Sequence, residues 1–225
     1  MNARLEDLES SSFELRMRAA VSLAWRLFAR KVGEGLIEVH KEASMQLQYA
    51  YLLQQLLPLL SFHPDESFRI ELETGVKLEG RSFEIDLLLT GRAAQRQHRI
   101  AIEMKCYRTL AASGDPRGAT DIFMKDVYED LYVTERYVEA QKAEEGLVLV
   151  MNEHRNLVAP TRRTAKCWDY DISHGAKFGP ILLTTPIGGK EVHIELKRSY
   201  NLDWSQEGKF WFLEAQGTAM PSISV

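Results

Sequence analysis

Two short apolar segments separated by a polar one constrain this chain more than any other feature of its sequence. Ser82–Leu89 and Arg99–Lys105 carry apolar residues at alternate positions, a spacing that predicts β-strands. The polar segment Thr90–His98 contains Gly91 and predicts a connecting loop. We therefore expect an antiparallel hairpin whose loop is centred between Ala94 and Gln95.

The apolar residues of this hairpin set its register. They fall on one face as the pairs Ile85–Met104, Leu87–Ile102 and Leu89–Ile100. The opposite face then receives the pairs Asp86–Glu103, Glu84–Lys105 and Leu88–Ala101. A shift by one residue would move every side chain to the other face and scatter both sets.

The opposed carboxylates of Asp86 and Glu103 suggest a metal site. Directly opposite residues have Cβ atoms about 4.5–5.5 Å apart, and like charges at that distance destabilise a sheet. Mg²⁺ would remove the repulsion, because it binds one or two carboxylates together with water and substrate phosphate. Lys105 projects from the same face and could orient a metal-bound water or stabilise charge on a phosphate. This combination indicates phosphodiester hydrolysis with Mg²⁺, or with Mn²⁺ as a substitute.

A simpler interpretation is that Glu84 and Lys105 form a cross-strand ion pair, with Asp86 and Glu103 merely solvated. The chain contains a second Glu-x-Lys, Glu195–Lys197, on a predicted strand. There, Glu195 is expected to face Leu182, so no second carboxylate accompanies it. The tripeptide is therefore weak alone, and the opposed aspartate distinguishes the first occurrence.

The remaining periodicities predict an α/β fold with a central mixed sheet flanked by helices and a β-rich C-terminal extension. Further predicted elements are helices over 11–31, 40–57 and 119–142, a loop over 113–118, a strand over 68–73 ended by Gly75, a doubly buried strand over 147–151, a short helix over 161–168, a hairpin of 181–185 with 192–200 turning at Gly188-Gly189, and a final strand over 209–214.

Composition narrows the class of protein. The chain has 225 residues, 45% of them hydrophobic, which fits one domain spanning 1–225. Its net charge of -4 argues against a protein that coats nucleic acid by bulk charge, although a local basic groove stays compatible. Two cysteines without metal-type spacing and no signal peptide indicate a cytoplasmic protein. The most apolar stretch, Leu47–Leu60, is too short to span a membrane.

The pattern Ile85-Asp86 followed by Ile102-Glu103-Met104-Lys105 resembles the PD-(D/E)XK nuclease superfamily. The predicted element order from about residue 40 to 151, namely α-β-β-β-α-β, is similar to the core of the restriction-endonuclease-like fold. The proline of the motif's name is absent here, since Ile85 precedes Asp86.

This resemblance implies a Mg²⁺-dependent nuclease, with a DNA endonuclease favoured. It assigns metal binding to Asp86, Glu103 and the Met104 carbonyl, and it assigns Lys105 to the attacking water. Glu42 matches a further acidic ligand that members often carry on the preceding helix. On a helical stripe with Gln46, Glu42 would face the sheet. It could equally serve only to favour the positive end of the helix dipole.

Nucleic-acid phosphates need cationic partners, and several arginines could supply them. The candidates, with Gln46, are Arg92, Arg96 and Arg99 around the hairpin loop, Arg108 after the motif, and Arg162 and Arg163 in a second basic segment. Lys125 and Asp126 could approach the site from the following helix. The expected partner is DNA rather than RNA, with a homodimer as a further expectation. The alternatives are an inactive module of the same fold that binds nucleic acid or protein, and a phosphohydrolase for small nucleotides.

Overall fold

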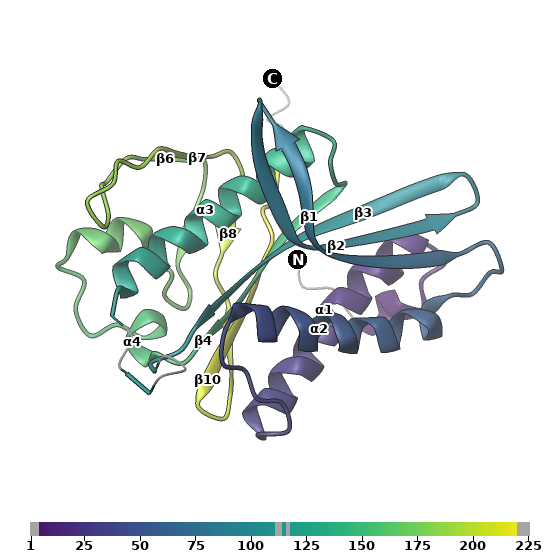
Figure 1. Cartoon of the computed structure of the whole chain (residues 1–225), viewed down its shortest axis with the longest axis horizontal. Helices are drawn as coiled ribbons and strands as arrows, with labels where there is room; N and C mark the ends of the chain where they lie inside the picture. Colours follow the sequence, from purple (N-terminus) through teal and green to yellow (C-terminus); the bar gives the residue numbers. More distant parts are fainter. Residues whose placement is uncertain (1–4, 111–113, 116–117, 220–225) are drawn as a thin grey trace.

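A mixed six-stranded sheet with helices on both faces forms the centre of the molecule in a computed structural model (Figure 1). The structure describes residues 5–110, 114–115 and 118–219. The helical elements are η1 (Leu5–Glu9), α1 (Phe13–Gly33), α2 (Glu42–Leu56), η2 (Leu57–Leu60), α3 (Thr120–Glu139), α4 (Arg155–Val158) and η3 (Lys166–Tyr170). The strands are β1 (Ser67–Leu78), β2 (Arg81–Ala93), β3 (Arg96–Tyr107), β4 (Glu145–Asn152), β5 (Lys177–Phe178), β6 (Ile181–Leu183), β7 (Ile194–Leu196), β8 (Tyr200–Asn201), β9 (Trp204–Glu207) and β10 (Phe210–Ala215).

The strands of the central sheet lie in the order β1-β2-β3-β4-β10-β9. β3 and β4 run parallel, and α3 connects them, while the other neighbours are antiparallel. β4 is buried on both faces from Leu147 to Met151, as its continuous apolar run predicts. The expected α/β class and mixed sheet flanked by helices are therefore confirmed.

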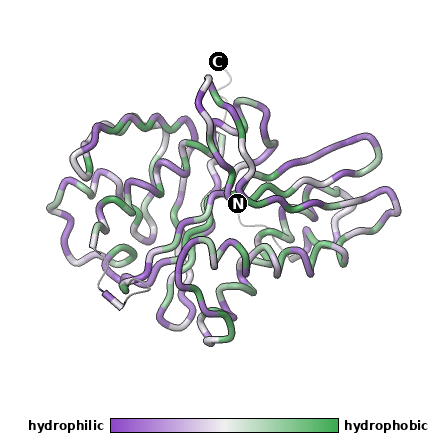
Figure 2. The backbone as a smooth tube through the Cα atoms, viewed as in Figure 1, coloured by the Kyte–Doolittle hydropathy of each residue, from purple (hydrophilic) through white to green (hydrophobic). Residues whose placement is uncertain are grey.

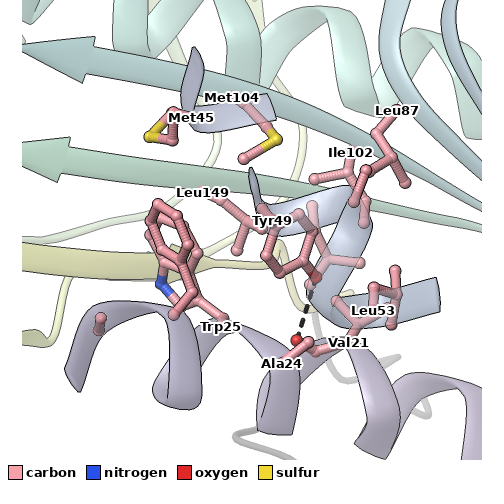
Figure 3. Close-up of a cluster of buried hydrophobic side chains, with 14 of the residues drawn as sticks. Val21, Ala24, Trp25, Met45, Tyr49, Leu53, Leu87, Ile102, Met104 and Leu149 are labelled. Carbon is pink, nitrogen blue, oxygen red and sulfur yellow. Dashed lines mark hydrogen bonds between the residues drawn. The ribbon is translucent and has the colours of Figure 1, made fainter. Parts of the chain in front are cut away.

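Each face of the sheet has its own hydrophobic core. α1 and α2 pack against one face, where Trp25, Tyr49 and Leu53 meet the inward side chains of β2, β3 and β4 (Figure 3). The Tyr49 hydroxyl donates to the Val21 carbonyl at 3.1 Å, which joins the two helices. α3 covers the other face together with the two small sheets β5-β8 and β6-β7. α1 begins at Ser12, whose hydroxyl accepts from the Leu15 N–H.

The β2–β3 hairpin has the predicted register. Its ladder includes Leu87–Ile102, Leu88–Ala101 and Leu89–Ile100, and it turns at Ala94–Gln95. The predicted loop Thr90–His98 is wrong in extent, because pairing continues to Ala93–Arg96. Both strands stay hydrogen-bonded past their apolar parts, so the polar residues extend the hairpin into solvent, and Figure 2 shows its turn as largely hydrophilic.

β1 is longer than predicted. Gly75 does not end the strand, because β1 continues to Leu78 by pairing with the first half of β2. Glu73 has a φ of 50° and leaves the ladder opposite Asp86, although the pairs on either side of it form. The positive φ changes the direction of the strand there. The β1–β2 hairpin thus bends at the level of Asp86.

The C-terminal third was predicted to be an extension of the core, but part of it belongs to the central sheet. β10 pairs with β4, and β9 pairs with β10, so this segment completes the central sheet. The predicted hairpin around Gly188-Gly189 forms between β6 and β7, but its strands are shorter than predicted, and Tyr200 lies in β8, which pairs with β5. The helix expected over 161–168 is wrong in its bounds, since only the 3-10 turn η3 forms. Half of the predicted loop over 113–118, namely residues 113, 116 and 117, lies outside the described residues. No helix within the described residues is long and apolar enough to cross a membrane.

Candidate active site

The candidate site lies where β2 separates from β3. The β2–β3 ladder ends at Leu87–Ile102. Beyond this pair, the N-terminal half of β2 pairs with β1, whereas β3 continues to pair with β4 as far as Tyr107. Because β2 leaves, no strand among the described residues pairs with the edge of β3 from Glu103 onward on that side. The site is built along this open edge.

Two carboxylates bind backbone N–H groups along the open edge of β3. The Met104 N–H donates to Asp86 Oδ2 at 2.6 Å, and the Cys106 N–H donates to Glu42 Oε2 at 3.3 Å. The N–H and C=O of a strand residue point to the same side, so the Met104 carbonyl faces the same gap. Asp86 comes from β2 and Glu42 from the first turn of α2. The side chains thus replace the ladder that the diverging strand would have formed.

Glu103 lies beside Asp86 and is the most enclosed acid of the group. Glu103 is 7% exposed, and its Oε1 atom is buried without a hydrogen-bond partner within the described part of the chain. Asp86 and Tyr137 are among the groups that influence its ionisation. The predicted cross-strand pair Asp86–Glu103 does not form in the ladder, which ends one position earlier at Leu87–Ile102, but the two acids are close enough to affect each other's pKa.

Lys105 lies between two further acids. Its ammonium is 3.6 Å from Glu42 Oε2 and 3.4 Å from Asp130 Oδ2, and its side chain is 21% exposed. Glu42 reaches it from α2 and Asp130 from α3, which cover opposite faces of the sheet. We call Glu42, Asp86, Glu103, Lys105 and Asp130 the acid–lysine cluster.

Burial and mutual repulsion raise the pKa values of the acids of the cluster. Burial raises the pKa of Glu42, of Asp86 and, to about 8, of Asp130. For Glu103, burial and then the charges of Asp86 and Asp130 raise the pKa well above its usual range. Burial lowers the pKa of Lys105, but the surrounding carboxylates outweigh it and raise that pKa, so the side chain stays an ammonium.

Two details of the predicted hairpin face are wrong. Ile85 does not face Met104, because it packs with Leu88 and Tyr137 in a separate cluster on the α3 side. Glu84 does not pair with Lys105; its carbonyl accepts from the Tyr137 hydroxyl at 3.3 Å. Both errors have one cause, since the expected register assumed a ladder that continues past Leu87.

Sequence reasoning missed Asp130 and Tyr137. It named Lys125 and Asp126 on the same helix, but these pair with each other at 2.7 Å, and Lys125 also binds Glu129. Asp130 lies beside the buried stripe of α3, three residues after Val127 and four before Thr134, and an acid at such a position was the available signal.

The stripe of α2 that includes Gln46 faces the sheet as predicted. Gln46 is 6% exposed, which leaves little of it available to a nucleic acid. Arg99 binds the Glu144 carboxylate at 2.7 Å, and Arg108 binds the Glu153 carboxylate at 2.7 Å. These two arginines are therefore engaged in ion pairs within the protein.

The other predicted phosphate-binding arginines lie on two separate segments of the chain. Arg92 and Arg96 are exposed near the tip of the β2–β3 hairpin, and Arg162 is exposed before η3. Arg163 donates to the Ser173 hydroxyl at 2.7 Å and lies over the Trp168 ring. Arg92 is six residues from Asp86 along β2, a distance of roughly 20 Å in an extended strand.

The donor atoms of the cluster are compatible with a hard divalent cation. Within the described residues, no three His, Cys, Asp or Glu side chains meet closely enough to form a metal site by themselves. Asp86, Glu103 and the Met104 carbonyl offer two carboxylates and one carbonyl, and Mg²⁺ commonly completes such a set with water and phosphate oxygens. The unpartnered Oε1 of Glu103 is an atom that such an ion would satisfy.

The second Glu-x-Lys has none of this environment. Glu195 faces Leu182 across β6–β7, as predicted, and Lys197 is half-exposed and paired with Glu139. No family model matches this chain, and comparisons with curated proteins and with solved structures give no significant match. The chemistry of the acid–lysine cluster is therefore the basis for assigning a function to this protein.

Proposed function

We propose that this protein is a metal-dependent nuclease that hydrolyses nucleic-acid phosphodiesters, with DNA as the favoured substrate and a restriction-endonuclease-like core. The observation that supports it most is the convergence of Asp86, Glu103 and Lys105 at the open edge of β3. The order α2-β1-β2-β3-α3-β4 agrees with the helix-strand order implied by the motif.

The carboxylates would hold Mg²⁺ or Mn²⁺. Asp86, Glu103 and the Met104 carbonyl are the proposed ligands, and Glu42 is the additional acid. The bound ion would neutralise these carboxylates, polarise the phosphate and lower the pKa of water. Its positive charge would also offset the repulsion among the carboxylates of the cluster, which has four carboxylates and one ammonium.

Lys105 acts as a cation in this proposal. Its raised pKa keeps the ammonium protonated, so it does not remove a proton from water. It donates hydrogen bonds that orient the water or a phosphate oxygen, and it stabilises negative charge as that charge develops. The exposed Arg92 and Arg96 would meet the substrate backbone at a distance from the scissile bond.

A non-catalytic module is the second candidate, and one observation favours it. Glu42 and Asp86 already bind the N–H groups of Cys106 and Met104, a role that would stabilise the open edge of β3 without any metal. Such a module would bind nucleic acid or a protein partner without cleaving phosphodiesters. The cleavage assay separates the two candidates.

The test incubates the wild-type protein and Lys105→Ala with single- and double-stranded DNA and RNA, in Mg²⁺, Mn²⁺ or EDTA. We expect cleavage only by the wild type and only with metal, with a loss of at least about 100-fold in Lys105→Ala, comparable to removal of one charge-stabilising donor. Lys197→Ala is the matched control, because it removes the lysine of the other Glu-x-Lys. Cleavage that survives in EDTA or in Lys105→Ala would refute the mechanism, and no cleavage of any substrate would favour the binding module.

A further inference from the structure

The Lys105 side chain is held from both faces of the sheet. Its ammonium is 3.6 Å from Glu42 on one side and 3.4 Å from Asp130 on the other. A lysine side chain has a flexible four-carbon stem and adopts many rotamers when it is free. Two opposed carboxylates restrict it to one position, where the charge of Asp86 also acts on it.

Asp130 is suited to this role by its location on α3. Its side chain is 14% exposed, and its Oδ2 atom is buried and makes no hydrogen bond within the described residues other than its ion-pair contact with Lys105. A carboxylate in such surroundings is stable only beside a counter-charge. Tyr137 follows seven residues later, two helical turns along the same face, and its hydroxyl donates to the Glu84 carbonyl at 3.3 Å. α3 therefore contacts β2 through Tyr137 and Lys105 through Asp130.

We propose that Asp130 is a positioning residue that, opposite Glu42, holds the Lys105 ammonium in place at the open edge of β3. The inference rests on the proposed nuclease function for its catalytic consequence. Asp130 touches Lys105 and is not a proposed metal ligand, so it acts through the lysine. Glu42 alone would leave the lysine free to swing away from the α3 side.

The first test measures the contact without any substrate. Urea unfolding is followed for the wild type, Asp130→Asn, Lys105→Met and the double variant, in EDTA. If Asp130 holds Lys105, the change in midpoint of the double variant differs from the sum of the two single changes. Additive changes would overturn the proposal. Glu129→Gln is the matched control, since Glu129 lies one position away and pairs with Lys125 instead.

The second test uses cleavage with Mg²⁺. We expect Asp130→Asn to lower kcat about 10–100-fold with KM for DNA nearly unchanged, as for other groups that orient a catalytic residue. Asp130→Glu keeps the counter-charge and should retain more of kcat. In a Lys105→Met background, Asp130→Asn should cause no further loss, because the group that it positions is gone.

The outcomes separate the two proposals. Equal losses from Asp130→Asn with and without Lys105 would overturn the positioning role while the nuclease function stands. Absence of cleavage by the wild type would remove the nuclease function, and the unfolding cycle would then decide alone whether Asp130 holds Lys105.

Discussion

Replacement of Glu103 by glutamine tests whether the two facing carboxylates repel each other. Glu103 is 7% exposed and lies beside Asp86, and the pKa of Glu103 is raised by burial and by the charges of Asp86 and Asp130. Glutamine has nearly the same shape and carries no charge. Its amide can also donate to the Asp86 carboxylate, which the glutamate cannot do when ionised.

The expected gain follows from the separation of the charges. Two unit charges about 5 Å apart repel by roughly 3 kcal/mol at an effective dielectric constant of about 20. Without metal at pH 9, we therefore expect Glu103→Gln to be more stable than the wild type by about 1–3 kcal/mol, because Asp86 is partly relieved already by the Met104 N–H. For a chain of this length, that corresponds to a rise in Tm of about 2–12 °C.

The stability that Glu103→Gln gains over the wild type should increase with pH. A raised pKa means that the folded protein holds a proton which the unfolded chain releases near pH 4.5. The stability contributed by this proton is complete below that pH and is lost as the pH rises through the pKa of the folded state. The wild type should therefore lose stability toward pH 9 more steeply than Glu103→Gln, and the two should agree near pH 5.

Urea unfolding followed by circular dichroism at pH 5, 7 and 9, in EDTA and in Mg²⁺, measures this difference. Glu195→Gln serves as the control, because Glu195 is exposed on β7 and should change stability by less than about 0.5 kcal/mol. Mg²⁺ should stabilise the wild type and have a smaller effect on Glu103→Gln, since a ligand that binds only the folded state adds to its stability. A variant that is less stable than the wild type at pH 9, or a difference that is the same at every pH, would refute the reasoning.

Two further predictions concern Glu42 and Gly91. Glu42→Gln should raise the Mg²⁺ concentration needed for half-maximal cleavage rate about 10–100-fold, because it removes a charge that faces both Lys105 and Asp86. An unchanged Mg²⁺ dependence would leave Glu42 with the structural bond to Cys106 alone. Gly91→Ala should destabilise the protein by about 1–3 kcal/mol in urea unfolding, since its Cβ would lie 2.2 Å from Met17 Sδ and 2.7 Å from Phe13 Cε1; Gly75→Ala, where nothing lies within 4 Å, is the control.

The β2–β3 hairpin shows which features of the site can be predicted from residues that lie close together in the sequence. Its register follows from alternation alone, because a slip of one residue would expose Leu87 and Leu89 and bury their polar neighbours. The same alternation predicted Asp86 opposite Glu103, and these two acids do affect each other's pKa, although the ladder ends at the preceding pair, Leu87–Ile102. The helical stripe of α2 likewise predicted that Glu42 would face the sheet, since its period depends only on nearby residues.

Tertiary structure decided the rest. Alternation describes a ladder that continues, so it could not predict that β2 would leave β3 after Leu87 and open the edge where the site lies. It also could not predict Asp130, which is distant from Lys105 in sequence and meets it only because α3 packs on that face of the sheet. The sequence alone determined which residues share a face, because side-chain direction has a short period along the chain. Only packing between distant elements determined where strands separate and which charges meet, because those contacts depend on burying the apolar faces of the sheet under α1, α2 and α3.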